Sequence, residues 1–185
     1  MRKVCAFLAT GLEEVECLAV VDVLRRSGVR VDLVSITGDP MVTGAHAITI
    51  KADALFEDED FSDCDCLFLP GGVPGTPNLA AHAGLTALLR QFAAEGRRIS
   101  AICAAPSVPG ALGLLKGRKA TCYPGWESKL LGADYTGAGV QTDGNFTTGR
   151  GLGFAIDLGL ELARLLASPE KSAQVKAGIQ HPDTI

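Results

Sequence analysis

Cys103 is the residue of this sequence best suited to covalent chemistry. Residues 99–102 form a short apolar run, typical of a buried strand. Residues 106–115 are predicted to form a helix, because a proline such as Pro106 fits the first helical turn. Cys103 then occupies a strand–turn–helix corner. Such nucleophile elbows hold the central residue in a strained backbone conformation and require small neighbours, here Ala101, Ala104 and Ala105.

Two interpretations of Cys103 stay open on the sequence alone. A helix N-terminus directs unpaired N–H groups and a partial positive charge at the sulfur, which favours a reactive thiolate. A cysteine is also a small apolar residue that commonly serves as a buried structural thiol.

Glu16 is the carboxyl group that could act with this sulfur. It lies in the first turns of the helix predicted after the first strand, together with Glu13 and Glu14. One possibility is that all three face solvent and balance the helix dipole. Alternatively, Glu16 turns inward towards Cys103. Burial and a nearby thiolate would then raise the pKa of Glu16, leaving a protonated acid that can shuttle a proton.

Gly71 and Gly72 follow a fully apolar strand and could bring backbone N–H groups close to a reacting oxygen. With the amide of Ala104 they would form an oxyanion pocket. A plain tight turn is the alternative. A phosphate-binding loop is excluded, because no Lys-Ser/Thr pair follows and the prolines of residues 70–75 remove donors.

The surrounding elements are predicted to alternate between strands and helices. Strands are expected over residues 3–9, 29–36, 66–69 and 119–122, helices over 13–27, 78–94, 152–167 and 170–178, hairpins over 41–50 and 135–148, and an acidic solvated loop over 56–65. This order predicts one α/β domain, residues 1–185, with a mostly parallel sheet and helices on both faces. Sites in such sheets lie at the carboxyl ends of strands, where residues 11–16, 70–75 and 103–106 would meet.

Composition excludes several classes of function. The net charge of −4 without a basic block argues against nucleic acid as a partner, and aromatic residues make up only 5% of the 185 residues. No apolar segment is long enough to span a bilayer, so we expect no membrane association. Six cysteines without a secretion signal indicate reduced thiols and a cytoplasmic protein. Three scattered histidines predict no metal cluster.

Three motifs together resemble the ThiJ/PfpI superfamily, and specifically its DJ-1 (protein deglycase) branch. They are Gly11-Leu12-Glu13-Glu14-Val15-Glu16, Leu69-Pro70-Gly71-Gly72 and Ala101-Ile102-Cys103-Ala104-Ala105-Pro106. Residues 22–28, 119–121 and 174–176 also match, so the resemblance covers almost the whole chain.

The resemblance implies a flavodoxin-like α/β sandwich, a homodimer and chemistry without a cofactor. It implies Cys103 as the nucleophile and Glu16 as the protonated acid beside it, with Gly71, Gly72 and Ala104 at the backbone-amide positions. The activities it implies are glyoxalase chemistry on glyoxal or methylglyoxal and deglycation of their early adducts on proteins or nucleotides. An alternative is an oxidative-stress sensor or chaperone that acts through a sulfinic acid on Cys103.

Two positions depart from that pattern. Tyr123 stands where some members carry a histidine, and it could donate a hydrogen bond to a substrate carbonyl but is a poor base near neutral pH. His46 stands where some carry an arginine, as a candidate anion contact. The residue after the cysteine is Ala104 rather than histidine, which argues against peptidase chemistry through a Cys-His pair.

Overall fold

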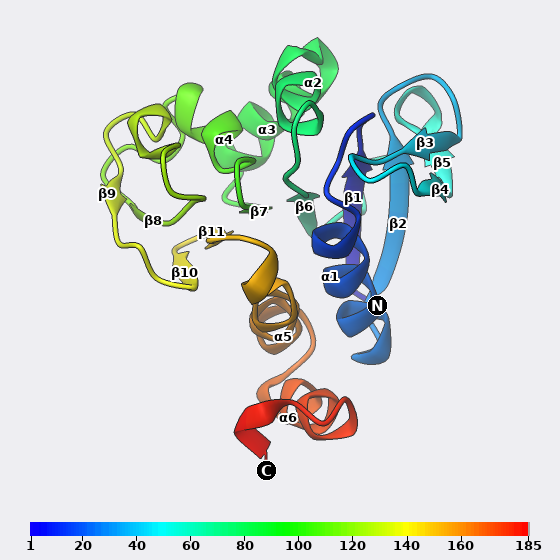
Figure 1. Cartoon of the computed structure of the whole chain (residues 1–185), viewed down its shortest axis with the longest axis vertical. Coiled ribbons are helices and arrows are strands. Elements are labelled where there is room, and N and C mark those ends of the chain that lie inside the picture. Colours follow the sequence, from blue (N-terminus) through cyan, green and yellow to red (C-terminus); the bar gives the residue numbers. More distant parts are fainter. Residues whose placement is uncertain (185) are drawn as a thin grey trace.

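The computed structural model describes residues 1–184; Ile185, the last residue of the predicted domain, lies outside the described residues. A seven-stranded sheet runs in the order β10-β11-β7-β6-β1-β2-β5 (Figure 1). All neighbouring strands are parallel except β10 and β11. The strands are β1 Lys3–Leu8, β2 Arg30–Ser35, β5 Ala54–Leu55, β6 Cys66–Leu69, β7 Arg98–Ile102, β10 Val140–Asp143 and β11 Phe146–Gly149.

Helices cover both faces of this sheet. They are α1 Glu14–Arg26, α2 Gly75–Ala81, α3 Ala83–Ala94, α4 Ser107–Ala111, α5 Ala155–Leu166 and α6 Pro169–Gly178. Two small sheets complete the fold, namely the antiparallel pair β3 Met41–Thr43 and β4 Thr49–Lys51, and the parallel pair β8 Lys119–Ala120 and β9 Asp134–Tyr135. Short 3-10 turns are Phe56–Asp58, Glu127–Lys129, Leu152–Phe154 and Pro182–Thr184. The predicted α/β sandwich with a mostly parallel sheet is therefore confirmed.

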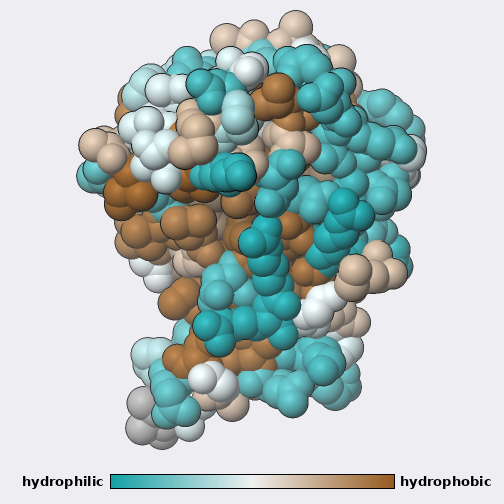
Figure 2. Space-filling model, turned by 90° about the vertical axis from the view of Figure 1, so that its right-hand side faces the viewer, coloured by the Kyte–Doolittle hydropathy of each residue, from teal (hydrophilic) through white to brown (hydrophobic). Residues whose placement is uncertain are grey.

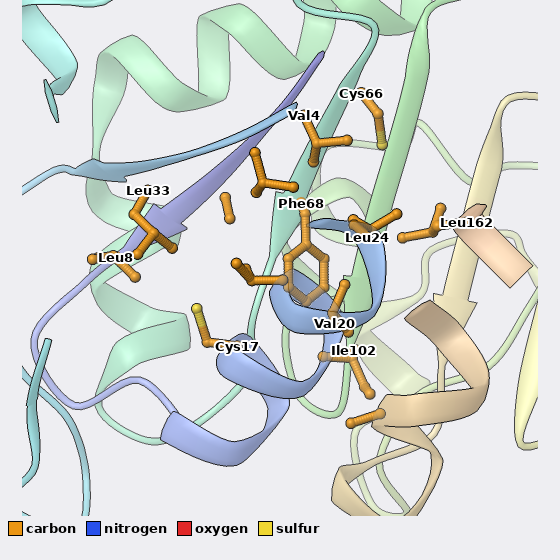
Figure 3. Close-up of a cluster of buried hydrophobic side chains, with 14 of the residues drawn as sticks. Val4, Leu8, Cys17, Val20, Leu24, Leu33, Cys66, Phe68, Ile102 and Leu162 are labelled. Atoms are coloured by element: carbon orange, nitrogen blue, oxygen red, sulfur yellow. The ribbon is translucent and has the colours of Figure 1, made fainter. Parts of the chain in front are cut away.

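The central strands are apolar at every position because both of their faces are buried. Side chains alternate between the two faces along β1: Val4, Ala6 and Leu8 join one core, and Cys5 and Phe7 join the other. The first core lies beneath α1 and α5, where Val20, Leu24 and Leu162 pack on strand residues such as Phe68 (Figure 3). The second core lies beneath α2, α3 and α4.

Several predicted elements differ in extent. The predicted helix 78–94 is two helices, because the extended backbone of His82 ends α2 and its Nδ1 caps α3 by accepting a hydrogen bond from Leu85 N. The predicted helix 106–115 is only the five-residue α4, and Lys119–Ala120 pairs with β9 outside the main sheet. In the second hairpin only Val140–Asp143 pairs with β11, around the two-residue turn Gly144-Asn145.

The acidic run 56–65 is predicted to be solvated, and this is correct only in part: Glu57, Asp58, Asp60 and Asp63 are exposed, whereas its other acids are partly buried. The nearly buried ammonium of Lys3 lies 2.6 Å from Glu59 and 2.7 Å from Asp63, so these acids form an ion-pair cluster at one end of β1. Phe61 of the same run packs on the core. Its acids pair because a buried lysine requires opposite charge.

Helices within residues 1–184 are all too short or too polar to cross a membrane. Figure 2 views the side of the molecule that carries β2 and the β3–β4 hairpin, and it shows hydrophobic patches among hydrophilic surface. The largest exposed apolar side chains of α1 are Val15 and Leu18.

Candidate active site

Cys103 lies directly after β7 with a backbone φ of +64°, a conformation that residues other than glycine rarely adopt. Two backbone hydrogen bonds hold it there. Its N–H donates to Gly149 O at 2.9 Å, and its carbonyl accepts from Tyr123 N at 2.8 Å. The strained corner predicted from the sequence is confirmed. The helix α4 is short and starts four residues after Cys103. The amides that bond the sulfur are instead those of Ala104 and Gly72.

Glu16 points inward and its side chain contacts Cys103. The residue is 1% exposed, and its Oε2 accepts a hydrogen bond from Gly71 N at 3.0 Å. Of the two interpretations, the inward one is therefore correct. Position on α1 explains the orientation, since Glu16 and the core residues Val20 and Leu24 are four residues apart and share one helix face.

Glu14 does not face solvent, which was one possibility from the sequence. It is 2% exposed because the turn between β3 and β4 folds over it. One carboxylate oxygen accepts hydrogen bonds from His46 N at 2.8 Å and Ile48 N at 3.4 Å. Gly44 leaves room for this carboxylate, since an added Cβ would collide with it.

Gly71 and Gly72 are required by the site's close approaches. A Cβ at Gly71 would lie 2.6 Å from both the Cβ of Cys103 and the Oε2 of Glu16. Gly72 has a φ of +95°, and a Cβ there would collide with Glu13 N. The Gly71 amide is already bonded to Glu16, which leaves the Gly72 and Ala104 amides to bind a reacting oxygen.

Three chain segments meet at the carboxyl ends of β1, β6 and β7, as the sequence predicted. Glu13 N donates to Gly71 O at 2.9 Å, and Gly75 N donates to Gly11 O at 3.0 Å. With the Gly71–Glu16 bond these contacts hold the acid and the glycine turn in one arrangement.

The electrostatics of the pair differ from the prediction of a simple low-pKa thiol. Burial raises the pKa of Glu16 to about 7, against the lowering effect of its hydrogen bonds with Cys103 and Gly71. Burial and the negative charge of Glu16 raise the pKa of Cys103 to about 12, and the amides of Ala104 and Gly72 oppose that rise.

The two groups are best described as one titrating unit. Between the two pKa values the pair keeps one proton and carries one negative charge. If the proton resides on Glu16, the repulsion that raises the pKa of Cys103 disappears, and the two amides stabilise the charge on sulfur. Because the pKa of Glu16, about 7, lies below that of Cys103, about 12, the proton resides mainly on the sulfur, and a thiolate beside a neutral acid is the minor arrangement, which the two amides favour.

Tyr123 and His46 occupy different positions relative to this pair. Tyr123 is joined to Cys103 through its backbone, and its side chain is half exposed. The exposed ring of His46 is engaged by carboxylates, with Nδ1 3.0 Å from Glu14 Oε2 and 3.6 Å from Glu13 Oε2. These acids raise the pKa of His46, so we do not assign it the anion contact expected from the resemblance.

The same acids and imidazole have metal-like spacing. One ligand atom each from Glu13, Glu14 and His46 lies within 4.8 Å of the others, and among residues 1–184 this is the only such group of three. Because Glu14 and His46 already satisfy each other, the arrangement is explained without an ion.

Sequence reasoning missed a hollow of about 320 Å³ beside the elbow. Tyr123, Pro124, Arg150, Gly151, Leu152, Gly153 and Phe154 line it. Residues 150–154 of this lining come directly after β11, which runs parallel to β7 and ends at the same edge of the sheet. The rule that sites lie at strand carboxyl ends could have identified residues 150–154, had β11 been predicted as a parallel neighbour of β7.

Comparison with known proteins places this geometry in context. The model of the DJ-1/PfpI family matches residues 2–165. The Parkinson disease protein 7 homolog of Danio rerio is 35% identical over 182 residues, with 95% of each chain covered. The crystal structure of Drosophila melanogaster DJ-1beta superposes with a TM-score of 0.93 at 32% identity, covering 97% of both chains.

Two further comparisons bear on activity and on length. A protein of Pyrococcus horikoshii named a deglycase is 31% identical over 151 residues, which are 80% of this chain and 89% of that protein. DJ-1 homolog B of Arabidopsis thaliana is 36% identical over 176 residues, 94% of this chain, yet the chain spans only 40% of that longer protein. The chain belongs to the DJ-1/PfpI family, among the homologs of DJ-1.

Proposed function

We propose that this protein is a cofactor-independent glyoxalase and deglycase that acts on glyoxal, methylglyoxal and their early adducts. The observation that carries the proposal is the contact between buried Glu16 and the strained Cys103, with the Gly72 and Ala104 amides bonding the sulfur. The relative named a deglycase supports the same class of reaction.

The first step is attack of the Cys103 thiolate on the aldehyde carbon. A carbon–sulfur bond forms, and the carbonyl oxygen becomes an oxyanion that the Gly72 and Ala104 amides bind. Glu16 then gives its proton to that oxygen, which yields a hemithioacetal and a carboxylate.

The second step is an internal redox transfer. The Glu16 carboxylate removes the proton from the former aldehyde carbon and returns it to the neighbouring carbon, while the hydroxyl proton passes between the two oxygens. The first carbon is oxidised to a thioester and the second is reduced to an alcohol. Water hydrolyses the thioester to lactate or glycolate and frees the sulfur. With a pKa near 7, Glu16 can serve as both acid and base near neutral pH.

Lactate production from methylglyoxal tests the proposal. Cys103→Ser and Glu16→Gln are each expected to lower kcat/KM at least about a hundredfold, the range typical of an acid–base group. Asp22→Asn is the matched control, because Asp22 is an exposed acid of the same helix, paired with Arg26. Lactate is measured rather than loss of methylglyoxal, because free thiols trap the aldehyde without catalysis. Equal rates in all four proteins would exclude the mechanism.

A redox-sensor role is the second candidate, and the same contact favours it. A neutral Glu16 beside Cys103 could donate a hydrogen bond to a sulfinate and so stabilise that oxidation state. Mass spectrometry after mild peroxide treatment distinguishes the candidates. A sensor requires selective sulfinate on Cys103, and oxidation confined to other cysteines would exclude it.

We also propose that the chain forms a homodimer through α1. Val15 and Leu18 are 50% and 41% exposed on one face of this helix. Because burial of such side chains is favourable, a second copy of the same face is a suitable partner.

A further inference from the structure

The hollow beside the elbow is built from the two segments that hold the backbone of Cys103. Tyr123 N donates to Cys103 O, and the N–H of Cys103 donates to Gly149 O, the residue before Arg150. The walls of the hollow are the continuations of these two segments, residues 123–124 and 150–154. The hollow therefore lies next to the backbone segment that carries the sulfur.

The walls are mostly apolar, with Arg150 as their charged residue, and they are open to solvent. Tyr123, Leu152 and Phe154 are 51%, 47% and 37% exposed, although such side chains are usually covered when they serve only packing. Phe154 is seated against Gly139, where a Cβ would collide with its ring. Gly151 has no side chain, and a Cβ there would lie 3.3 Å from the Tyr123 ring, so the absence of one keeps the space clear.

The hollow is large relative to methylglyoxal. Its volume of about 320 Å³ is at the lower end of ligand pockets, which begin near 300 Å³. A methyl group is comparable to a water molecule, whose share of liquid volume is about 30 Å³. The methyl group of methylglyoxal would leave most of these apolar walls uncovered, whereas a branched alkyl group or a ring would cover them.

We infer that the preferred substrates are 2-oxoaldehydes whose second carbon carries a branched alkyl or aryl substituent, and that Leu152 and Phe154 determine this preference. The inference rests on the proposed function, because it places the aldehyde carbon on Cys103. The reaction is the same as for methylglyoxal: one water is consumed, and the 2-oxoaldehyde becomes a 2-hydroxy acid without an external oxidant or reductant.

Two substrates and four proteins test the inference. Initial rates of 2-hydroxy acid formation are measured with 4-methyl-2-oxopentanal and with methylglyoxal. The wild type is expected to show a kcat/KM about tenfold higher for the branched substrate, since contacts of a few methylene groups are worth this much. Leu152→Ala and Phe154→Ala are each expected to lower the ratio of the two values about tenfold. Leu131→Ala is the control, because Leu131 is 53% exposed but lies outside the hollow.

The ratio of the two substrates is the decisive readout, because loss of folded enzyme lowers both values equally and leaves the ratio unchanged. A wild-type ratio near one, or a ratio that neither Leu152→Ala nor Phe154→Ala changes, would overturn the inference while leaving the proposed function intact. Absence of 2-hydroxy acid from both substrates would instead refute the proposed function itself.

Discussion

Replacement of Glu16 by glutamine should lower the pKa of Cys103, because it removes the negative charge beside the sulfur. In the wild type, burial and the Glu16 charge raise the pKa of Cys103 to about 12. Glutamine keeps the shape of the side chain but removes the charge. Two unit charges at about 4 Å interact by about 4 kcal/mol at an effective dielectric constant near 20, so about three pH units is the upper limit of the change.

The pKa of Cys103 in Glu16→Gln should therefore fall below about 12 but stay above that of an exposed cysteine, because burial, the larger cause of the rise, remains while the repulsion is lost. The rate of alkylation by iodoacetamide, measured against pH, reports the thiolate directly. The variant should show one rise, centred below pH 12. The wild type should show two rises in the alkylation rate. The first should lie near pH 7, where the Glu16–Cys103 pair loses the first of its two protons, and the second near pH 12, where it loses the other.

The size of the first rise in the wild type measures how much of the single negative charge resides on sulfur. Mass spectrometry of the alkylated peptide separates the alkylation of Cys103 from that of the other cysteines. The control variant Asp22→Asn should reproduce the wild-type profile of alkylation rate against pH. Superimposable profiles for the wild type and Glu16→Gln would refute the shared-proton description, because they would show that the sulfur does not sense the carboxyl group.

Three further predictions concern stability, packing and assembly. Because the pKa of Glu16 is raised in the folded state, its contribution to stability is present below pH 4.5 and is lost as the pH rises through about 7. Glutamine does not titrate, so the unfolding free energy of Glu16→Gln should rise relative to that of the wild type by up to about 3 kcal/mol between pH 4 and pH 8. Urea titrations at the two pH values measure this difference. Gly71→Ala places a Cβ 2.6 Å from Cys103 and Glu16, so it should separate the pair and lower lactate formation about a hundredfold, and full activity would show that the contact is dispensable. Val15→Asp adds charge to the proposed dimer face and should convert the dimer to a monomer in sedimentation at micromolar concentration; a wild-type monomer would contradict the dimer.

The general form of the site followed from residue types and order. Alternating apolar runs predicted the parallel sheet, and the rule that sites lie at the carboxyl ends of strands placed residues 11–16, 70–75 and 103–106 together. The hydrogen bond from Glu13 N to Gly71 O and the contact between Glu16 and Cys103 confirm this. Small residues around Cys103 predicted its strained corner, which the φ of +64° confirms. These features are local or follow from strand order, so the sequence contains them.

The direction of each acidic side chain was decided only by tertiary structure. Glu14 and Glu16 look alike in the sequence, yet the β3–β4 turn buries one against backbone amides and the core packing of α1 directs the other at Cys103. The same holds for the sulfur: helix position alone suggested a low pKa, whereas burial and the carboxyl group raise it.

What the sequence by itself determined is the fold class and the identity of the cysteine and its candidate acid, because hydrophobic periodicity and turn chemistry are properties of short segments. What only the tertiary structure decided is the single proton shared by Glu16 and Cys103 and the hollow between residues 123–124 and 150–154. Both depend on distances between segments far apart in the chain, and desolvation and Coulomb interactions are functions of those distances.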